Sequence, residues 1–343
     1  MKRLLNTLYI TTHGAWLSRE SDCIVVRVEQ EEKFRVPAIG LESIVCMAGV
    51  GFSPPLMKLC AEHGVGVSFL TESGEFIARV LGPVSGNVFL RRQQYRVADD
   101  ENKKCAIARS VVLGKIVNTR TVIMRSARDH NDEFISARLN ACSDRLQRIM
   151  GAVKESMSSD NIRGKEGEAG HVYFSVFNDM IVARKDEFQF TGRSRRPPMD
   201  EVNALLSFAY TLMVHDTQGA LEAVGLDPQV GFLHTERPGR PSLALDMMEE
   251  LRPVIADRLV LSLINRQQLG TKDFERSESG GVFLKKDSRK IVLKEYQDRK
   301  RDEIYHPFID EKIAIGLLPH VQARLLARHL RGDIDGYPPF FWK

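Results

Sequence analysis

The sequence lacks the marks of a secreted, zinc-binding or membrane protein. Its five cysteines are an odd number, and none stands in a Cys-x-x-Cys pair, so neither a disulfide framework nor a zinc knuckle is expected. No uncharged stretch approaches the ~20 apolar residues that a membrane helix needs. Asn6 and Thr7 interrupt the apolar start of the chain, which argues against a signal peptide. These absences predict a cytoplasmic protein with buried, reduced cysteines.

The composition is that of a globular chain with a slight excess of positive charge. Of the 343 residues, 43% are hydrophobic and 27% are charged, and the net charge is +4. This length allows two domains with separate cores. A mildly basic balance is weak evidence for a nucleic-acid partner, so the local grouping of arginines carries more information than the total.

The first 97 residues have the pattern of closely spaced strands. Short apolar and β-branched runs alternate there with glycine, proline and polar turns. The expected strands are 8–12, 23–28, 34–36, 43–47, 64–70 and 75–81. A helix is expected at 54–63 and a polar turn at 29–33.

The rest of the chain has the period of helices. Apolar residues recur at helical spacing in 135–153, 202–213, 254–264 and 321–330, which predicts amphipathic helices with buried faces. Polar composition predicts loops at 156–165 and 272–281. The predicted fold class is therefore α+β, with a small β-rich domain over 1–97 and a larger all-α domain over 98–343.

Three acidic residues and a histidine could form a divalent-metal site. Asp246 and Glu249 are three residues apart in a helix-like run, so their carboxylates share a face, whereas Glu250 is rotated by about 100° from Glu249. With His234, and with Glu166 from another helix, they form a donor set that suits Mn²⁺ or Mg²⁺. Such an ion would neutralise the charge that develops in phosphodiester chemistry. Because carboxylates at this spacing are commonly solvated surface, spacing alone leaves both interpretations open.

The densest basic segment is a candidate DNA contact. Arg193, Arg195 and Arg196 stand together without acidic neighbours, and such arginines can neutralise backbone phosphates without reading sequence. The alternative is a solvated, charged face. The basic segments 91–96 and 289–301 allow the same two interpretations.

The aromatic and proline-rich segment 336–343 also allows two interpretations. Exposed aromatic side chains often form a docking surface for a partner. They could equally pack on their own domain. The sequence favours neither.

Several motifs, spread over nearly the whole chain, carry a resemblance to a known family. Together they are more specific than any single motif. They are Leu5-Asn6-Thr7-Leu8-Tyr9, Gly82-Pro83-Val84-Ser85-Gly86-Asn87, Arg91-Arg92-Gln93-Gln94-Tyr95, Arg163-Gly164-Lys165-Glu166-Gly167, Gly231-Phe232-Leu233-His234, the run from Gly239 to Pro253, His306-Pro307-Phe308, Gly316-Leu317-Leu318-Pro319 and Leu330-Arg331-Gly332-Asp333. The chain resembles the CRISPR-associated integrases of the Cas-one family, and within it most closely the subtype I-C branch.

The resemblance implies a set of metal ligands. The glutamate of the family's Arg-Gly-x-Glu-Gly motif matches Glu166, its histidine matches His234, and its last acidic ligand matches Glu249. The acid that precedes this ligand matches Asp246, which is expected close to the ion. Either Asp246 or Glu249 could be the direct ligand, and Glu249 is favoured.

Two further residues are expected near the DNA. Arg163 matches a family arginine near the active centre. Tyr173 lies seven residues after Glu166, on the same helix face. The alternative for Tyr173 is plain packing in the core.

The resemblance also implies function and partners. The expected activity is the insertion of short foreign DNA fragments into a CRISPR array by attack of a 3′-hydroxyl on a repeat phosphodiester. The expected assembly is a homodimer, joined through its β-rich domains, which binds double-stranded DNA, a Cas-two dimer and, in the I-C branch, a Cas-four nuclease. Two alternatives remain: a general metal-dependent nuclease that repairs branched DNA, and a non-catalytic DNA-binding scaffold.

Overall fold

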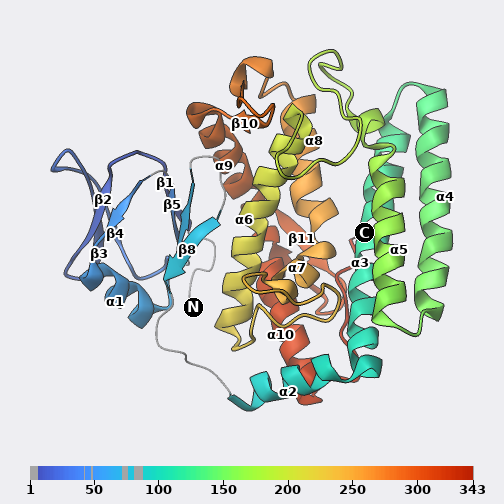
Figure 1. Ribbon diagram of the computed structural model, residues 1–343, viewed down its shortest axis with the longest axis horizontal. Coiled ribbons are helices and arrows are strands. Elements are labelled where there is room, and N and C mark those ends of the chain that lie inside the picture. The colour runs from blue at the N-terminus through green and yellow to red at the C-terminus, as the bar shows by residue number, and fades with distance from the viewer. Residues whose placement is uncertain (1–6, 42, 48, 72–75, 81–87, 343) are drawn as a thin grey trace. The chain divides into compact units, whose positions relative to one another are not determined.

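Two stretches that are distant in sequence form the first of two compact units. Unit 1 consists of Met1–Gly86 and Leu284–Arg301, and unit 2 of Asn87–Phe283 and Asp302–Lys343. The structure, a computed structural model, describes residues 7–41, 43–47, 49–71, 76–80 and 88–342 (Figure 1). Of the motifs quoted above, 82–87 and residues 5 and 6 lie outside the described residues. The predicted α+β class is confirmed, with strands in the N-terminal region followed by a mostly helical part.

Unit 1 contains a sheet whose first three strands are parallel. In spatial order the strands are β1 (Thr7–Ile10), β5 (Ser43–Met47), β7 (Gly66–Leu70) and β8 (Phe76–Val80). Strand β8 runs antiparallel to β7. Helix α1 (Pro54–His63) lies in the connection between the parallel strands β5 and β7. It begins with proline and ends before Gly64, whose φ is 62°, so both of its predicted limits follow from local chemistry.

The second sheet of unit 1 contains a strand that the sequence did not reveal. Its spatial order is β4 (Glu31–Pro37), β3 (Cys23–Val28), β2 (Trp16–Glu20) and β6 (Gly51–Phe52). Strand β2 was missed because its second half, Ser18 to Glu20, is polar. The structure shows why this polar half is tolerated: Arg27 on β3 donates to Ser18 Oγ at 2.8 Å and also bonds Glu20.

The core of unit 1 lies between its strands and α1. Leu17, Ile24, Ile44, Leu56 and Leu59 are each at most 1% exposed and belong to one apolar cluster. Burying each such side chain stabilises the fold by ~1.5–3 kcal/mol. The short apolar and β-branched runs therefore predicted most of these strands, whereas β2, which contributes Leu17 to the core, was missed.

Helix α9 (Lys286–Arg301) also belongs to unit 1. Its buried residues include Val292, Leu293 and Tyr296, and Gln297 Nε2 donates to the hydroxyl of Tyr9 at 3.0 Å. The β-rich unit therefore depends on a helix that the chain supplies far downstream.

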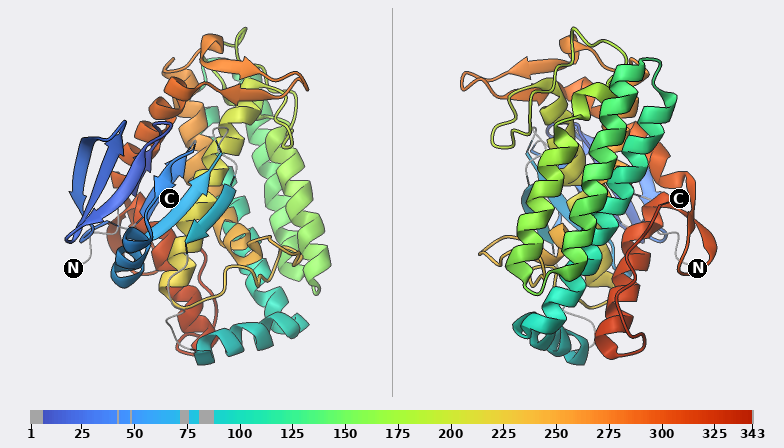
Figure 2. Two further views of the ribbon diagram at one scale, coloured as in Figure 1. Left: turned by 60° about the vertical axis from the view of Figure 1, so that its left-hand side comes forward. Right: turned by 90° about the vertical axis from the view of Figure 1, so that its right-hand side faces the viewer.

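Unit 2 consists mainly of helices. They are α2 (Val88–Asp99), α3 (Glu101–Asp129), α4 (Glu133–Glu155), α5 (Ser159–Phe174), α6 (Glu201–Ala223), α7 (Ser242–Glu249), α8 (Arg258–Asn265) and α10 (Leu318–Arg331), with a π-helical turn at Pro253–Asp257 and short 3₁₀ turns at Phe177–Met180, Thr271–Asp273 and Ile315–Leu317. The predicted helical stripes are confirmed. Helices α3, α4 and α5 run side by side (Figure 2). Asp100 and Asp132 cap the starts of α3 and α4 by accepting backbone N–H bonds, as N-cap residues do.

Two predicted loops are wrong in part. Residues 159–165, predicted as loop, are the first two turns of α5, because Ser158 caps this helix and Asp160 lies in its first turn. The glycines of α5 interrupt the helical repeat of apolar residues, so the sequence pattern did not indicate a helix there. The predicted loop at 272–281 contains β9 (Phe274–Arg276), which pairs with β10 (Val282–Leu284). A second hairpin is formed by β11 (Glu303–His306) and β12 (Glu311–Ala314).

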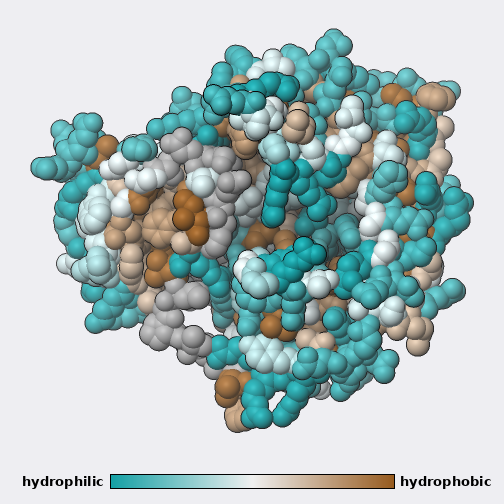
Figure 3. Space-filling view, in the orientation of Figure 1, coloured by the Kyte–Doolittle hydropathy of each residue, from teal (hydrophilic) through white to brown (hydrophobic). Residues whose placement is uncertain are grey.

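The face of unit 2 that Figure 3 shows is largely polar. Figure 3 shows hydrophilic side chains over much of the visible face of this unit. Among the residues that the structure describes, no helix is both long and apolar enough to span a bilayer.

The aromatic segment near the C-terminus packs on its own unit. Tyr337, Phe340 and Trp342 are at most 8% exposed. Asn118 on α3 donates to the Phe340 carbonyl at 2.9 Å and accepts the Trp342 N–H at 2.7 Å. It also donates to the Glu250 carbonyl at 2.7 Å. Of the two interpretations of this segment, the structure supports packing within the unit.

A buried carboxyl lies in the middle of unit 2. Asp257 is 1% exposed and accepts a hydrogen bond from the hydroxyl of Tyr210 at 2.6 Å. Burial raises the pKa of Asp257 to about 6, and the bond from Tyr210 offsets only part of this rise. The folded protein therefore holds the proton of Asp257 more tightly than the unfolded chain does.

Replacing Asn118 with alanine is expected to destabilise unit 2 strongly. The change leaves the carbonyls of Glu250 and Phe340 and the N–H of Trp342 buried without a partner. Each such loss costs ~1–3 kcal/mol, so the free energy of unfolding should fall by about 3 kcal/mol or more in chemical denaturation. Asn140→Ala, at an exposed position of α4, is the control and should change it by less than about 0.5 kcal/mol. Equal effects of the two changes would contradict the role of Asn118.

Asp257 should make stability depend on pH. Its pKa is about 6 in the folded protein against an ordinary value of 3.8, so the folded state binds the extra proton between these values. The contribution of Asp257 is fully present below pH 4 and is lost as the pH rises through 6. The melting temperature of the wild type should therefore fall, relative to that of Asp257→Asn, between pH 4 and pH 7. Parallel pH profiles of the two proteins would refute this assignment.

Candidate active site

Helix α5 brings Glu166 to the side of the neighbouring helix α3. Its side chain is about one-fifth exposed and bonds the ammonium of Lys115 on α3. Three residues before Glu166, Arg163 donates from Nε to the Leu233 carbonyl at 2.8 Å and pairs with Asp160. Arg163 therefore ties α5 to the loop that carries the histidine.

Asp246 holds the loop between α6 and α7 in place. One of its carboxylate oxygens accepts the backbone N–H groups of Phe232 and Leu233, at 2.6 and 2.9 Å. The other accepts the N–H of His234 at 2.9 Å and lies 2.7 Å from His234 Nδ1. Asp246 is fully buried, so these four contacts satisfy both of its oxygens. A proton on Nδ1 directed at Asp246 leaves the lone pair of His234 Nε2 available, as in many metal-binding histidines.

Gly231 permits this close approach of the loop to α7. A Cβ atom at this position would lie 2.6 Å from Asp246 Oδ2 and 2.8 Å from the Ser242 carbonyl carbon. Since these neighbours are a fixed carboxylate and backbone, they could not yield without moving the loop. The glycine of the Gly-Phe-Leu-His motif is therefore required by packing.

Glu249 is buried at the centre of the group. Its Oε1 lies 3.7 Å from His234 Nε2 and 2.9 Å from Arg252 Nη1, and its Oε2 lies 2.8 Å from Lys115 Nζ. Burial alone would raise the pKa of Glu249, but the positive charges of Arg252 and Lys115 outweigh it and lower the pKa to about 2. Glu249 is therefore ionised at neutral pH despite being 1% exposed.

Lys115 is the residue of the site that the sequence did not reveal. Its side chain is 12% exposed, and its ammonium contacts both Glu166 and Glu249. Burial lowers the pKa of Lys115, but the two carboxylates outweigh this effect and raise it. The only signal in the sequence was a lysine among the buried positions of a long helix. Such a lysine is usually interpreted as lying at the edge of the buried face of the helix.

The donor groups suit a divalent ion, and Lys115 contacts the two carboxylates among them. Glu249 Oε2 is buried and has no hydrogen bond of ordinary geometry within the described part of the chain, in spite of its short distance to Lys115. Together with Glu166 and His234 Nε2 it offers two carboxylates and one imidazole, which Mn²⁺ and Mg²⁺ accept. Among the described residues, no three His, Cys, Asp or Glu side chains converge closely enough to hold an ion as they stand. The donor atoms therefore suit a divalent ion in their chemical type and lie near one another. For an ion to bind both carboxylates, the contacts of Lys115 with Glu166 and Glu249 would have to open.

The predicted DNA-contact residues lie in different environments. Arg195 and Arg196 are exposed. Arg193 is half-buried, donates to Asn203 Oδ1 at 2.6 Å and lies over the Tyr210 ring. It therefore orders its own loop.

Tyr173 belongs to the core of unit 2. It is 3% exposed and stacks edge-on against Phe177, with 5.6 Å between the ring centroids. Of the two interpretations of Tyr173, this position fits core packing and does not offer the ring to DNA.

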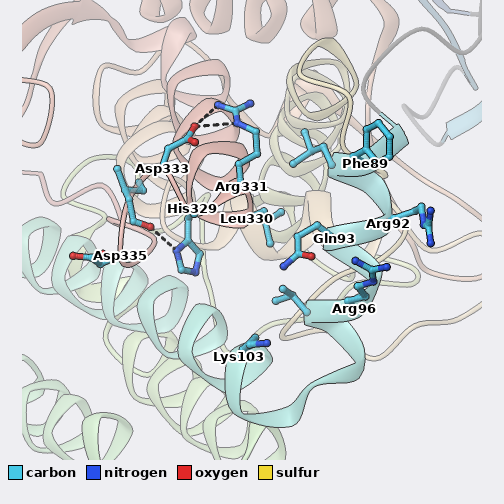
Figure 4. Close-up of a pocket in the computed structure, with 14 residues that line it drawn as sticks. Phe89, Arg92, Gln93, Arg96, Lys103, His329, Leu330, Arg331, Asp333 and Asp335 are labelled. Atoms are coloured by element: carbon cyan, nitrogen blue, oxygen red, sulfur yellow. Dashed lines mark hydrogen bonds and ion pairs between the residues drawn. The ribbon is translucent and has the colours of Figure 1, made fainter.

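A separate pocket of about 950 Å³ lies on unit 2 (Figure 4). Arg92 and Arg96 of α2 and Lys103 of α3 line one part of it. His329 and Arg331, from α10, line another, and Arg331 pairs with Asp333 at 2.7 Å. The residues that line this pocket include none of the proposed site residues Glu166, His234, Asp246 and Glu249. The pocket is therefore distinct from the candidate active site.

The chain is similar to known proteins over its full length. The family model for CRISPR associated protein Cas1 matches residues 8–298. A CRISPR-associated endonuclease Cas1 from Chlorobaculum tepidum is 52% identical over 343 residues, covering all of both chains. Another from Rhodospirillum rubrum is 50% identical over 347 residues, again covering all of both.

Solved structures share the fold at lower sequence identity. A CAS1 protein from Thermotoga maritima has a TM-score of 0.83 at 23% identity, over 95% of this chain and 97% of that chain. A casposase bound to integration product has a TM-score of 0.85 at 22% identity, over 98% and 94% of the two chains.

Some similar proteins occur with, or fused to, others. The fold is shared with a chain of a Cas6-RT-Cas1–Cas2 complex, with a TM-score of 0.82 at 20% identity over 98% of this chain and 36% of that one. A Cas4/Cas1 fusion from Geobacter sulfurreducens is 37% identical over 97% of this chain and 60% of its own length. The match of the family model and the identity to full-length relatives together show that this chain belongs to the CRISPR-associated Cas1 family.

Proposed function

We propose that this protein is a metal-dependent DNA endonuclease and integrase. It inserts short foreign DNA fragments into a CRISPR array by attack of a 3′-hydroxyl on a repeat phosphodiester. The observation that carries the proposal is the group Glu166, His234 and Glu249, whose histidine is held by Asp246 with its Nε2 directed toward Glu249. Membership of the Cas1 family supplies the substrate class.

Glu166, His234 and Glu249 would hold the Mn²⁺ or Mg²⁺ ion. When bound, such an ion neutralises developing negative charge and lowers the pKa of an attacking hydroxyl. Arg252 adds a fixed positive charge beside Glu249 at 2.9 Å, where it can stabilise a phosphate in the transition state. With water in place of the 3′-hydroxyl, the same site cuts DNA.

Glu249, and not Asp246, is the direct ligand in this proposal. Both oxygens of Asp246 are used by three backbone N–H groups and by His234 Nδ1. Glu249 keeps an oxygen without a hydrogen bond of ordinary geometry. Asp246 is thus a positioning residue that orients the histidine.

The DNA surface includes Arg195 and Arg196. Both are exposed on the loop that precedes α6, where they can neutralise backbone phosphates. Arg193 supports the same loop from within through Asn203, and Arg163 supports the histidine loop through the Leu233 carbonyl.

The assembly in this proposal is a homodimer that works with partner proteins. Strand β8 is the last strand in the order β1–β5–β7–β8 of unit 1, and Ile77 on it is 60% exposed, which suits an interface between two β-rich units. A Cas2 dimer and, for a subtype I-C protein, a Cas4 nuclease are the proposed partners. The Cas2-containing complex and the Cas4/Cas1 fusion among similar proteins support this choice.

Two other functions make different predictions. A non-catalytic scaffold would bind DNA without using the buried, ionised Glu249, whose burial is costly to maintain without a purpose. A repair nuclease outside CRISPR immunity would cut branched DNA but would show no preference for a repeat sequence.

Removing any one ligand should abolish strand transfer. The test measures the joining of a labelled 3′-hydroxyl duplex to a supercoiled plasmid that carries the repeat, with Mn²⁺ and the Cas2 partner. Glu166→Ala, His234→Ala and Glu249→Ala should each lower the rate by roughly a thousandfold, because the ion contributes several kcal/mol to the transition state. Asp246→Asn should lower it by about 10–100-fold. Chelation of the metal should stop the wild-type reaction.

The controls separate the alternatives. DNA binding, measured by gel shift, should persist in all four variants. Wild-type protein that binds DNA but joins nothing would favour the scaffold, and cutting of branched DNA without repeat preference would favour the repair nuclease. Activity kept in Glu249→Ala and lost in Asp246→Ala would mean that Asp246 is the ligand.

Replacing Arg195 and Arg196 should weaken DNA binding in a salt-dependent manner. Each phosphate contact removed lowers the slope of log affinity against log salt by ~0.9 for duplex DNA. The double alanine variant should therefore lose a slope of about 1.8 if both arginines contact phosphate. Arg128→Ala at the exposed end of α3 is a control for lost charge, and an equal loss there would contradict a specific role for the loop.

A further inference from the structure

Lys115 stands between the two carboxylates that the proposed function assigns to a metal ion. Its ammonium bonds Glu166 Oε1 and lies 2.8 Å from Glu249 Oε2. Neither carboxylate comes from its own helix: Glu166 is on α5 and Glu249 on α7. A single buried cation thus joins three helices at the point where the donors meet.

Two positive side chains already pair with the two carboxylates of this cluster. The carboxylates of Glu166 and Glu249 contribute two negative charges, and Lys115 and Arg252 contribute two positive charges. Asp246 is separately satisfied by backbone N–H groups and by His234. A divalent ion that bound Glu166 and Glu249 would lie close to the ammonium of Lys115 and the guanidinium of Arg252, whose positive charges oppose its binding.

We infer that Lys115 is a built-in counter-ion that competes with the divalent metal for Glu166 and Glu249. When a DNA phosphate enters, the ammonium of Lys115 pairs with the phosphate and releases the two carboxylates. This inference rests on the proposed function and identifies a regulator of the same site. It assigns Lys115 a regulatory role, since the lysine controls the access of the metal ion to the two carboxylates.

The consequence is that metal and DNA bind cooperatively. A phosphate group brings the negative charge that the cluster lacks and a new partner for the lysine. Because coupling between two ligands is reciprocal, DNA should strengthen metal binding by the same factor by which metal strengthens DNA binding. The lysine would thereby restrict metal loading to protein that already holds DNA.

A purely structural lysine would behave differently. If Lys115 only joins α3 to α5 and α7, its removal leaves Glu166 without this ion pair and Glu249 with Arg252 alone, and it loosens the ligands. The protein would then lose stability, and its affinity for metal would stay the same or fall. The direction of the change in metal affinity therefore separates the two roles.

The experiment measures Mn²⁺ binding to the full chain by calorimetry and by the electron paramagnetic resonance signal of free Mn²⁺, with and without a short branched DNA duplex. Lys115→Met should bind Mn²⁺ roughly tenfold more tightly than the wild type without DNA, because one positive charge has left the cluster. DNA should strengthen Mn²⁺ binding to the wild type by more than about fivefold, and to the variant by less. Lys115→Arg keeps the charge and should resemble the wild type.

The matched control is Lys165→Met. Lys165 is next to Glu166 in sequence but pairs with Glu168 at 3.0 Å and is 40% exposed, so its removal should change Mn²⁺ affinity by less than about twofold. Lys115→Gln is measured in parallel with Lys115→Met, so that the comparison of Mn²⁺ affinity with the wild type survives if one variant fails to fold. The effect of DNA on Mn²⁺ binding to the wild type is tested independently of both variants.

The outcomes distinguish this inference from the proposed function. Unchanged or weaker Mn²⁺ binding in the folded Lys115 variants, or a wild-type Mn²⁺ affinity that DNA leaves unchanged, overturns the inference while the metal site stands. Mn²⁺ binding that His234→Ala and Glu166→Gln leave intact overturns the assignment of the metal site itself, and the inference with it.

Discussion

The candidate active site depends on the four contacts of one buried carboxylate. Asp246, on α7, accepts the N–H groups of three consecutive loop residues and orients the imidazole of His234. The loop can approach because Gly231 has no side chain. Three residues further along α7, Glu249 faces the same imidazole. The spacing of Asp246 and Glu249 therefore lets one acid hold the loop while the other faces the imidazole, where we propose that it binds a metal ion.

Keeping charge inside the helical unit requires compensation at short range. A buried carboxylate such as Glu249 loses its hydration, and attraction to a partner offsets this loss only when the geometry is good. Here Lys115 and Arg252 provide that attraction from α3 and from the residue before a π-helical turn. Such turns are often found at functional sites. The stability of this unit and its capacity for chemistry thus use the same charges.

Local signals predicted much of the fold, and long-range contacts account for what they missed. The strand at 43–47 and the helix at 54–63 agree with their predicted limits, because a short apolar run, proline and glycine act over a few residues. The start of α5 was missed because glycine weakens the apolar period. Family motifs pointed to Glu166, but Lys115, its partner 51 positions earlier, belongs to no local pattern. The sequence could not decide whether Tyr173 faces DNA or packs in the core, because the answer depends on neighbours that only folding brings together.

The docking of the aromatic segment has a consequence for the order of synthesis. Asn118 and its partner Trp342 are 224 positions apart, and Glu250, next to Glu249, accepts the N–H of Phe340. Since chains fold as they emerge from the ribosome, α7 leaves the exit tunnel well before the segment that completes its support. A nascent chain that already contains Glu166, His234 and Glu249 therefore still lacks the contacts that Glu250 and Asn118 make with this segment.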